Sequence, residues 1–288
     1  MLFKTVLATG LMAMTAAAHQ LPKRGERIGC GTRGPSENQR KVQHDLALQE
    51  AADRNLNLAI SGGGNAKKED IEVNVYMHSV SAKNATLLSD KVLKSQFDVM
   101  ADVFSDYDIK MHLAGTSRTV NPKWAGADGD EMGMKLALRR GTYADLNMYY
   151  VDDLDAYGYC YYPDAYRANS TGFWQDGCTV MATTVPGGSE APYNHGMTSV
   201  HEAGHWFGLI HTFGETDNGC DGPGDEIHDT PAQRTESRGC PVGRDSCPGK
   251  PGVDPIHNYM DYSDDTCYDE FTPGQVRRIR SMWDNFRA

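Results

Sequence analysis

One segment constrains this chain more than any other: it reads His201-Glu202-Ala203-Gly204-His205-Trp206-Phe207-Gly208-Leu209-Ile210-His211. Residues four apart on a helix share one face, so His201 and His205 can bind one metal ion. Gly208 can adopt the left-handed conformation that ends a helix, which lets His211 supply a third nitrogen. Three neutral nitrogens leave a fourth position open for water, which is typical of catalytic zinc.

Glu202 lies beside these ligands and can reach a zinc-bound water without binding the metal. The spacing therefore predicts hydrolysis in which Glu202 accepts the proton of the attacking water. The five fixed positions of the motif, three histidines, one glutamate and one glycine, should occur together by chance in on the order of one in 10⁵ chains of this size. Structural histidines on an ordinary helix are therefore a weak alternative. A capping box from Ser199 to Glu202 would tie that carboxylate to the backbone, and we expect the helix to begin near Asn194 instead.

The first 18 residues are typical of a signal peptide. Lys4 precedes an apolar stretch over 5–18 that ends in three alanines. The stretch is shorter than the roughly 20 residues that cross a bilayer, so we expect a secreted, extracellular protein. A buried N-terminal helix is the alternative. Lys23-Arg24 is either a dibasic processing site or a solvated pair, and the sequons at Asn84 and Asn169 predict glycosylation.

The charge balance limits the partners. The chain has 28 Lys and Arg against 39 Asp and Glu, a formal net charge of −11, and no basic stripe. This argues against nucleic acid and anionic membranes. We expect a monomer that acts on proteins or peptides.

Hydrophobic periodicity predicts an α+β fold. Helices are expected over 40–58, from Ser89 or Asp90 onward, over 129–139 and over 273–285, and strands over 71–80, 109–113, 146–151 and 178–184. This order predicts an upper lobe with a mixed twisted sheet backed by helices. We divide the chain into a signal peptide (1–18), an N-terminal segment that could be a pro-segment (19–60) and a catalytic domain (61–288). Beyond about residue 210, Gly, Pro, Asp and Cys predict an irregular, disulfide-stapled lower lobe (211–288) that ends in a helix.

The histidine motif resembles that of the metzincin zinc endopeptidases, which add a methionine-containing turn beneath the metal. With the segments 224–231, 254–267 and 271–275, the chain is similar to the pappalysin family, close to its secreted fungal members. The resemblance spans residues 201–275 and implies a zincin-like fold, one catalytic Zn²⁺ and endopeptidase activity. It makes Met260 the methionine of the turn and Tyr262 a stabiliser of the oxyanion.

The resemblance also implies crossed disulfides, Cys220–Cys247 and Cys240–Cys267, although the sequence alone allows three pairings of these four cysteines. Cys160 and Cys178 remain as a third pair. Cys30 is then odd. An unpaired thiolate is a good zinc ligand, so Cys30 could fill the open coordination position and keep a zymogen silent; a free thiol and a further disulfide stay open.

Two acidic clusters have alternative interpretations. Asp225, Asp229 and Thr230 bring oxygen ligands together in a Gly/Pro-rich loop, and the resemblance implies a structural Ca²⁺ nearby; a solvated acidic turn is the alternative. Asp264 and Asp265 follow the methionine turn. They either favour Lys or Arg in the substrate beyond the scissile bond or serve as turn acids.

Two other functions are compatible with a zinc site. A catalytically silent, zinc-stabilised binding module is disfavoured by the presence of Glu202 and Tyr262. A zinc amidase acting on small or cell-wall amides is disfavoured because no carbohydrate-binding segment is visible in the sequence. A protease assay separates these functions.

Overall fold

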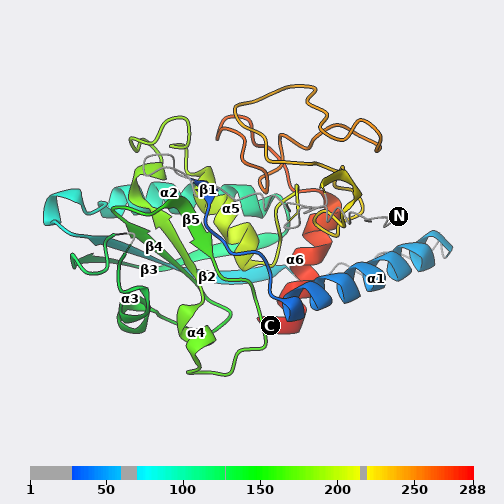
Figure 1. Cartoon of the computed structure of the whole chain (residues 1–288). Helices are drawn as coiled ribbons and strands as arrows, with labels where there is room; N and C mark the ends of the chain where they lie inside the picture. The colour runs from blue at the N-terminus through cyan, green and yellow to red at the C-terminus, as the bar shows by residue number, and fades with distance from the viewer. Residues whose placement is uncertain (1–27, 60–69, 127, 215–218) are drawn as a thin grey trace, which may run out of the picture.

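A mixed six-stranded sheet forms the centre of the upper lobe, in a computed structural model that describes residues 28–59, 70–126, 128–214 and 219–288 (Figure 1). The signal-peptide region and Lys23-Arg24 lie outside the described residues. The strand order is β1-β5-β6-β4-β2-β3, and only β5 and β6 run antiparallel. The strands are β1 (Ile28–Cys30), β2 (Ile71–Ser81), β3 (Ile109–Val120), β4 (Leu146–Val151), β5 (Ala156–Cys160) and β6 (Cys178–Met181). The predicted α+β fold with a mixed sheet is therefore confirmed.

The described part of the chain also contains six α-helices and three short 3₁₀ helices. They are α1 (Glu37–Ala59), η1 (Asn84–Thr86), α2 (Asp90–Ser105), α3 (Glu131–Leu138), α4 (Thr171–Gln175), η2 (Ala182–Thr184), α5 (Met197–Trp206), η3 (Gly219–Asp221) and α6 (Pro273–Phe286). Helices α1 and α6 contact each other and lie together beside the sheet, in blue and red in Figure 1.

The main core forms where β2, α2 and α5 meet. Alternate residues of β2, Val73, Val75 and Met77, are fully buried, as the period of two predicts. Ser89 caps α2 by accepting a hydrogen bond from the backbone of Val92, and Phe104 of α2 packs in the same cluster as Val75. Each such side chain stabilises the fold by roughly 1.5–3 kcal/mol through burial, and together they hold α5 against the sheet.

Several boundaries differ from those expected. β3 continues from Leu113 to Val120 because its backbone stays paired with β2, although alternate side chains are exposed. β5 and α4 were not predicted, since Tyr- and Gly-rich sequence carries little periodicity. β6 stops at Met181, where η2 begins.

Helix α5 begins at Met197, between the two starts considered from the sequence. Gly196 precedes it with φ of 91°, a left-handed conformation that glycine adopts at little cost. Ser199 lies inside the first turns, where its hydroxyl contacts that of Tyr150 at 3.1 Å. Glu202 is therefore free of the capping role and can face the substrate side of the helix.

The lower lobe depends on covalent and capping interactions. Beyond His211, regular helices in the described residues are limited to η3 and α6. Disulfides Cys220–Cys247 and Cys240–Cys267 each join residues 27 positions apart. In a chain-entropy model, each such crosslink stabilises the folded state by roughly 3–4 kcal/mol. Cys160–Cys178 joins directly opposite residues of β5 and β6. Thr272 and Gln275 form a capping box that begins α6.

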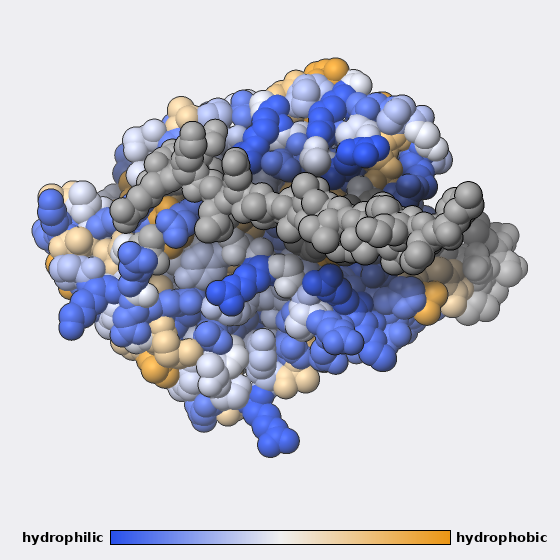
Figure 2. Space-filling model, in the orientation of Figure 1, coloured by the Kyte–Doolittle hydropathy of each residue, from blue (hydrophilic) through white to orange (hydrophobic). Residues whose placement is uncertain are grey.

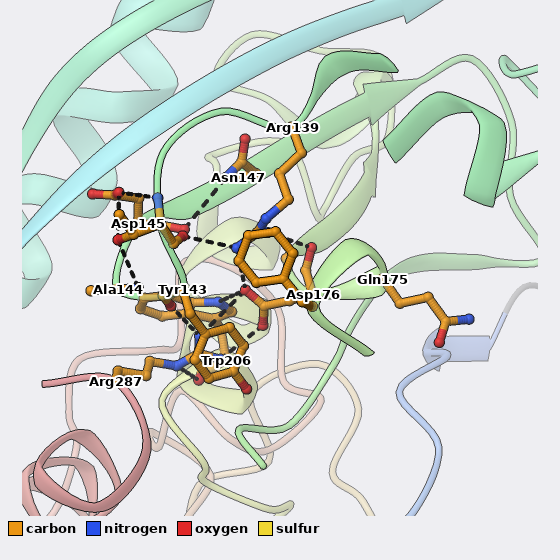
Figure 3. A network of polar contacts seen from close by, with 12 residues as sticks. Arg139, Tyr143, Ala144, Asp145, Asn147, Gln175, Asp176, Trp206 and Arg287 are labelled. Carbon is orange, nitrogen blue, oxygen red and sulfur yellow. Dashed lines mark hydrogen bonds and ion pairs between the residues drawn. The ribbon is translucent and has the colours of Figure 1, made fainter. Parts of the chain in front are cut away.

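A buried charge network ties the end of α5 to the end of the chain (Figure 3). Asp176 is fully buried between Arg139, at 3.2 Å, and Arg287, at 2.9 Å. The indole Nε1 of Trp206 donates to Asp176, and Nε of Arg287 donates to the carbonyl of Trp206 at 3.1 Å. Because Trp206 directly follows His205, this network fixes the end of the helix that carries two histidines of the predicted metal site.

The face seen in Figure 2 is dominated by hydrophilic residues, with hydrophobic ones in small separate groups. In the described residues no helix is both long enough and apolar enough to cross a membrane.

Candidate active site

The three histidines of the motif converge on one point. Nε2 of His205 lies 3.1 Å from Nε2 of both His201 and His211, and the third separation is 3.3 Å. Nitrogens about 2.0–2.1 Å from a tetrahedral zinc ion are about 3.3–3.4 Å apart, so the arrangement fits that ion closely. Gly208, with φ of 98°, makes the turn that brings His211 back to α5.

Backbone carbonyls orient two of the rings. Nδ1 of His201 lies 2.7 Å from the carbonyl oxygen of Tyr259, and Nδ1 of His205 lies 2.7 Å from that of Leu209. Protons on Nδ1 satisfy these acceptors and leave both Nε2 lone pairs directed at the common point. Burial lowers the pKa of His201 to about 3, and it also lowers that of His205, so both rings are neutral, as metal ligands must be.

Glu202 lies against β5 rather than among the nitrogens. A Cβ on Gly158 would lie 2.8 Å from Cγ of Glu202, so only glycine at that position leaves room for the side chain. The hydroxyl of Thr32 donates to Oε2 of Glu202 at 3.1 Å, while Oε1 is buried and has no hydrogen-bond partner among the described residues. Burial raises the pKa of Glu202 to about 8, against the opposing hydrogen bonds from Cys30 and Thr32. Oε1 is an acceptor available to a water or substrate proton.

Met260 and Tyr262 both lie close to the histidines. Met260 is fully buried beneath α5, where Gly204 gives its sulfur room. The hydroxyl of Tyr262 lies 3.2 Å from Nε2 of His211 and donates to the carbonyl of Cys30 at 3.4 Å. Tyr262 can therefore donate a hydrogen bond to an oxygen bound beside the histidines.

The N-terminal segment occupies this site. β1 pairs in parallel with β5, with Cys30 opposite Gly158. Sγ of Cys30 lies 3.4 Å from Nε2 of His205, close to the roughly 3.6 Å expected between nitrogen and sulfur ligands of one tetrahedral zinc ion. Cys30 and the three histidines form a buried cluster of potential ligand atoms, all within 4.8 Å of one another. Cys30 is the one cysteine that forms no disulfide, and the other six form three disulfides.

A cavity opens beside Glu202, lined by Met197, Tyr193, Arg238, Asp265 and Tyr268. Asp265 is buried, and its Oδ2 accepts from the backbone of His195 at 2.7 Å. Its Oδ1 has no hydrogen-bond partner in the described residues, and burial raises its pKa to about 6. Arg238 faces its own carboxylate partner, Glu236, at 3.3 Å. Asp264 is not among the lining residues.

The two aspartates of the suggested calcium loop accept hydrogen bonds from the protein itself. Asp229 caps α6, accepting from the hydroxyl of Thr272 at 2.9 Å and from the backbone of Gly274 at 2.8 Å. Asp225 is buried and accepts from the backbone of Ile227 at 3.0 Å. The structure gives no support to calcium here.

The sequence patterns did not identify three residues that support the site. Thr32 and Gly158 contact Glu202 from distant segments of the chain. Asp176 accepts a hydrogen bond from the indole of Trp206, the residue that follows His205. Nothing in their local sequence marks them, because their roles depend on contacts made only in the folded chain.

Comparisons with known proteins agree with this geometry. Residues 143–284 match the peptidase family described as "Pregnancy-associated plasma protein-A". The chain is 49% identical to an extracellular metalloprotease of Podospora anserina, a match that covers 100% of this chain and 99% of the relative. Mature mirolysin of Tannerella forsythia, solved with a cleaved peptide, is 28% identical with a TM-score of 0.61, covering 76% of this chain and 93% of that one. A promirolysin mutant from the same organism is 25% identical with a TM-score of 0.65, covering 90% of this chain and 94% of that one.

Proposed function

Because the chain belongs to the pappalysin family of zinc metalloendopeptidases, we propose that it is secreted, that it hydrolyses peptide bonds with Glu202 as its general base, and that the described form is its latent zymogen. The convergence of three Nε2 atoms at 3.1–3.3 Å, beside a Glu202 oxygen that has no partner in the described part of the chain, carries the proposal. Secretion is supported by the signal-peptide pattern and by relatives that are named extracellular metalloproteases. The sequons at Asn84 and Asn169 lie on exposed residues, which suits glycosylation.

The histidines His201, His205 and His211 would hold the zinc ion. When bound, the ion supplies a Lewis acid that makes water nucleophilic near neutral pH and polarises the substrate carbonyl. Glu202 takes the proton from the attacking water and then delivers it to the leaving amine. Tyr262 donates a hydrogen bond to the oxygen that gains negative charge.

Latency follows from the position of the N-terminal segment. Cys30 takes the place that a water or substrate carbonyl needs, and Thr32 engages the carboxylate that must accept the proton. The share of this chain that aligns rises from 76% with mature mirolysin to 90% with promirolysin, which supports a pro-form.

The cavity beside Glu202 favours a basic side chain immediately after the scissile bond. Oδ1 of Asp265 is a buried carboxylate oxygen that no described residue contacts by a hydrogen bond, and a guanidinium or ammonium group would satisfy it. The aromatic walls formed by Tyr193 and Tyr268 suit the aliphatic stem of such a side chain.

The testing experiment is casein hydrolysis by protein whose N-terminus has been sequenced, measured before chelation, after a zinc-selective chelator and after zinc is restored. We expect activity that is lost to the chelator and returns with zinc, in the form that lacks Cys30. Zinc-loaded protein that lacks Cys30 and is inactive on casein would contradict the proposal and favour the amidase or the silent module.

A further inference from the structure

The neighbours of Tyr262 differ in whether an active form would keep them. The N-terminal segment packs on its ring, since a Cβ on Gly29 would lie 2.8 Å from a ring carbon, and the carbonyl of Cys30 accepts from its hydroxyl. A form that lacks the residues up to Cys30 has neither contact. Among the contacts that stay are Phe213, whose ring lies edge-on with centroids 5.1 Å apart, and Arg238.

Arg238 places a positive charge over the ring of Tyr262. Its guanidinium carbon lies 5.6 Å from the ring centroid, within the roughly 6 Å over which a cation is attracted to an aromatic face. Both side chains line the cavity beside Glu202. The attraction restrains the ring, and the same positive charge favours the negative charge that gathers on the oxygen to which Tyr262 donates.

Arg238 is itself held from the other wall of the cavity. Burial raises the pKa of Tyr193, against a hydrogen bond from Arg238 that lowers it. The ring of Tyr193 lies in turn against that of Tyr157 on β5, with centroids 4.8 Å apart. A chain of contacts therefore runs from β5 in the upper lobe through Tyr193 and Arg238 to Tyr262 in the lower lobe.

The ion pair of Arg238 with Glu236 does not account for its position. Glu236 lies two positions away in the chain, and the two side chains are 50% and 37% exposed. Exposed pairs of this kind contribute little energy, because water and salt screen them. The ring of Tyr262 and the hydroxyl of Tyr193 are therefore the contacts that fix the guanidinium.

We propose that Arg238 is a positioning residue for peptide hydrolysis: held by Tyr193, it fixes the ring of Tyr262 so that the hydroxyl points at the oxygen that gains negative charge. The inference rests on the proposed function and adds a residue to it. The hydroxyl of Tyr262 lies 3.2 Å from Nε2 of His211, so a modest rotation of the ring carries it away from the site. Loss of Arg238 should therefore slow the chemical step and leave substrate binding nearly unchanged.

The test measures kcat and KM of activated protein, freed of Cys30, on two peptides that differ only in having Arg or Leu after the scissile bond. Arg238→Gln should lower kcat about 3–10-fold on both peptides and change KM by less than about 2-fold. Arg238→Lys keeps the cation and should recover most of the loss. Tyr193→Phe should lower kcat to a smaller extent. Arg234→Gln is the matched control and should have no effect, because this exposed arginine of the same loop is not among the residues that line the cavity.

A double-mutant cycle shows whether Arg238 acts through the Tyr262 hydroxyl. Tyr262→Phe keeps the ring and removes the hydroxyl, so Arg238→Gln should change kcat by less than about 2-fold in that background. An equal loss in both backgrounds would overturn the inference, and so would a loss confined to KM or to one of the two peptides. If Arg238→Gln does not fold, Tyr193→Phe takes its place in the cycle.

The proposed function fails in a different way. Normal kcat in Tyr262→Phe would refute the oxyanion role of Tyr262 and the inference with it, and an activated, zinc-loaded wild type that hydrolyses neither peptide nor casein would refute the endopeptidase. A slow Tyr262→Phe together with a normal Arg238→Gln would refute the inference alone.

Discussion

A Cβ atom on Gly204 would lie 2.4 Å from the sulfur of Met260, so the helix that carries the zinc-site histidines rests directly on the methionine turn at a position where only glycine fits. Gly204 lies between His201 and His205 in the motif, on the side of α5 that faces Met260. Any side chain there would push the helix away from its support and shift both histidines.

Gly204→Ala should therefore lower the free energy of unfolding by about 1–3 kcal/mol, the usual cost of overpacking a core, and weaken zinc binding. Denaturant unfolding and zinc titration measure the two effects. Gly249→Ala is the matched control, since a Cβ there meets no atom within 4 Å. If steric conflict is the cause, Met260→Ala should cost less in the Gly204→Ala background than in the wild type. Additive losses would refute this explanation.

Glu202→Gln should keep the fold and the zinc content while kcat/KM on casein falls by about 10²–10⁴-fold or more, because only the proton carrier is removed. The measurement uses activated protein with metal content determined in parallel. Glu270→Gln changes an exposed carboxylate and should have no effect. Near-normal turnover in Glu202→Gln would exclude this residue as general base.

Cys30→Ser should raise the casein activity of the uncleaved chain about 10-fold or more, because a hydroxyl is a far weaker zinc ligand than a thiolate. After removal of the N-terminal segment, variant and wild type should be equally active. Unchanged latency in the uncleaved variant would show that the segment blocks the site without help from the sulfur.

Asp265→Asn should reduce the preference for Arg over Leu after the scissile bond by about 10-fold, because a charge-assisted hydrogen bond is lost. Burial raises the pKa of Asp265 to about 6, so the negative charge disappears as the pH falls through that value. The Arg-to-Leu ratio of kcat/KM in the wild type should fall with it, and this ratio cancels the titration of Glu202. Asp264→Asn is the control. A ratio near one at neutral pH in the wild type would rule out Asp265 as the determinant.

Asp176→Asn should destabilise the protein by about 3–5 kcal/mol, because Arg139 and Arg287 would be left buried without a negative partner. Asp284→Asn, on the exposed face of α6, should change stability by less than about 0.5 kcal/mol. Thermal and denaturant unfolding provide the comparison. Equal stability of the two variants would mean that the buried cluster in Figure 3 is not held by charge.

Periodicity predicted the strands and helices whose burial alternates regularly. β2 and α2 were found where the sequence indicated, because each buries one regular face. β5 could not be predicted, because its short Tyr- and Gly-containing sequence has no clear hydrophobic pattern. Its residues are explained by tertiary contacts, since the strand lies against Glu202 and pairs with β1. The extension of β3 was missed for a related reason, as backbone pairing with β2 needs no apolar pattern.

The sequence by itself determined the chemistry: the spacing of His201, Glu202, His205 and His211 depends only on helix geometry and one glycine turn, which are local. Tertiary structure decided what surrounds that chemistry. It placed Cys30 beside His205, Thr32 on Glu202 and Glu50 on Arg278, contacts between residues 170 to 228 positions apart. No local pattern encodes such contacts, because they exist only after the core has packed and brought distant segments together. The proposed latent state is therefore a property of the fold.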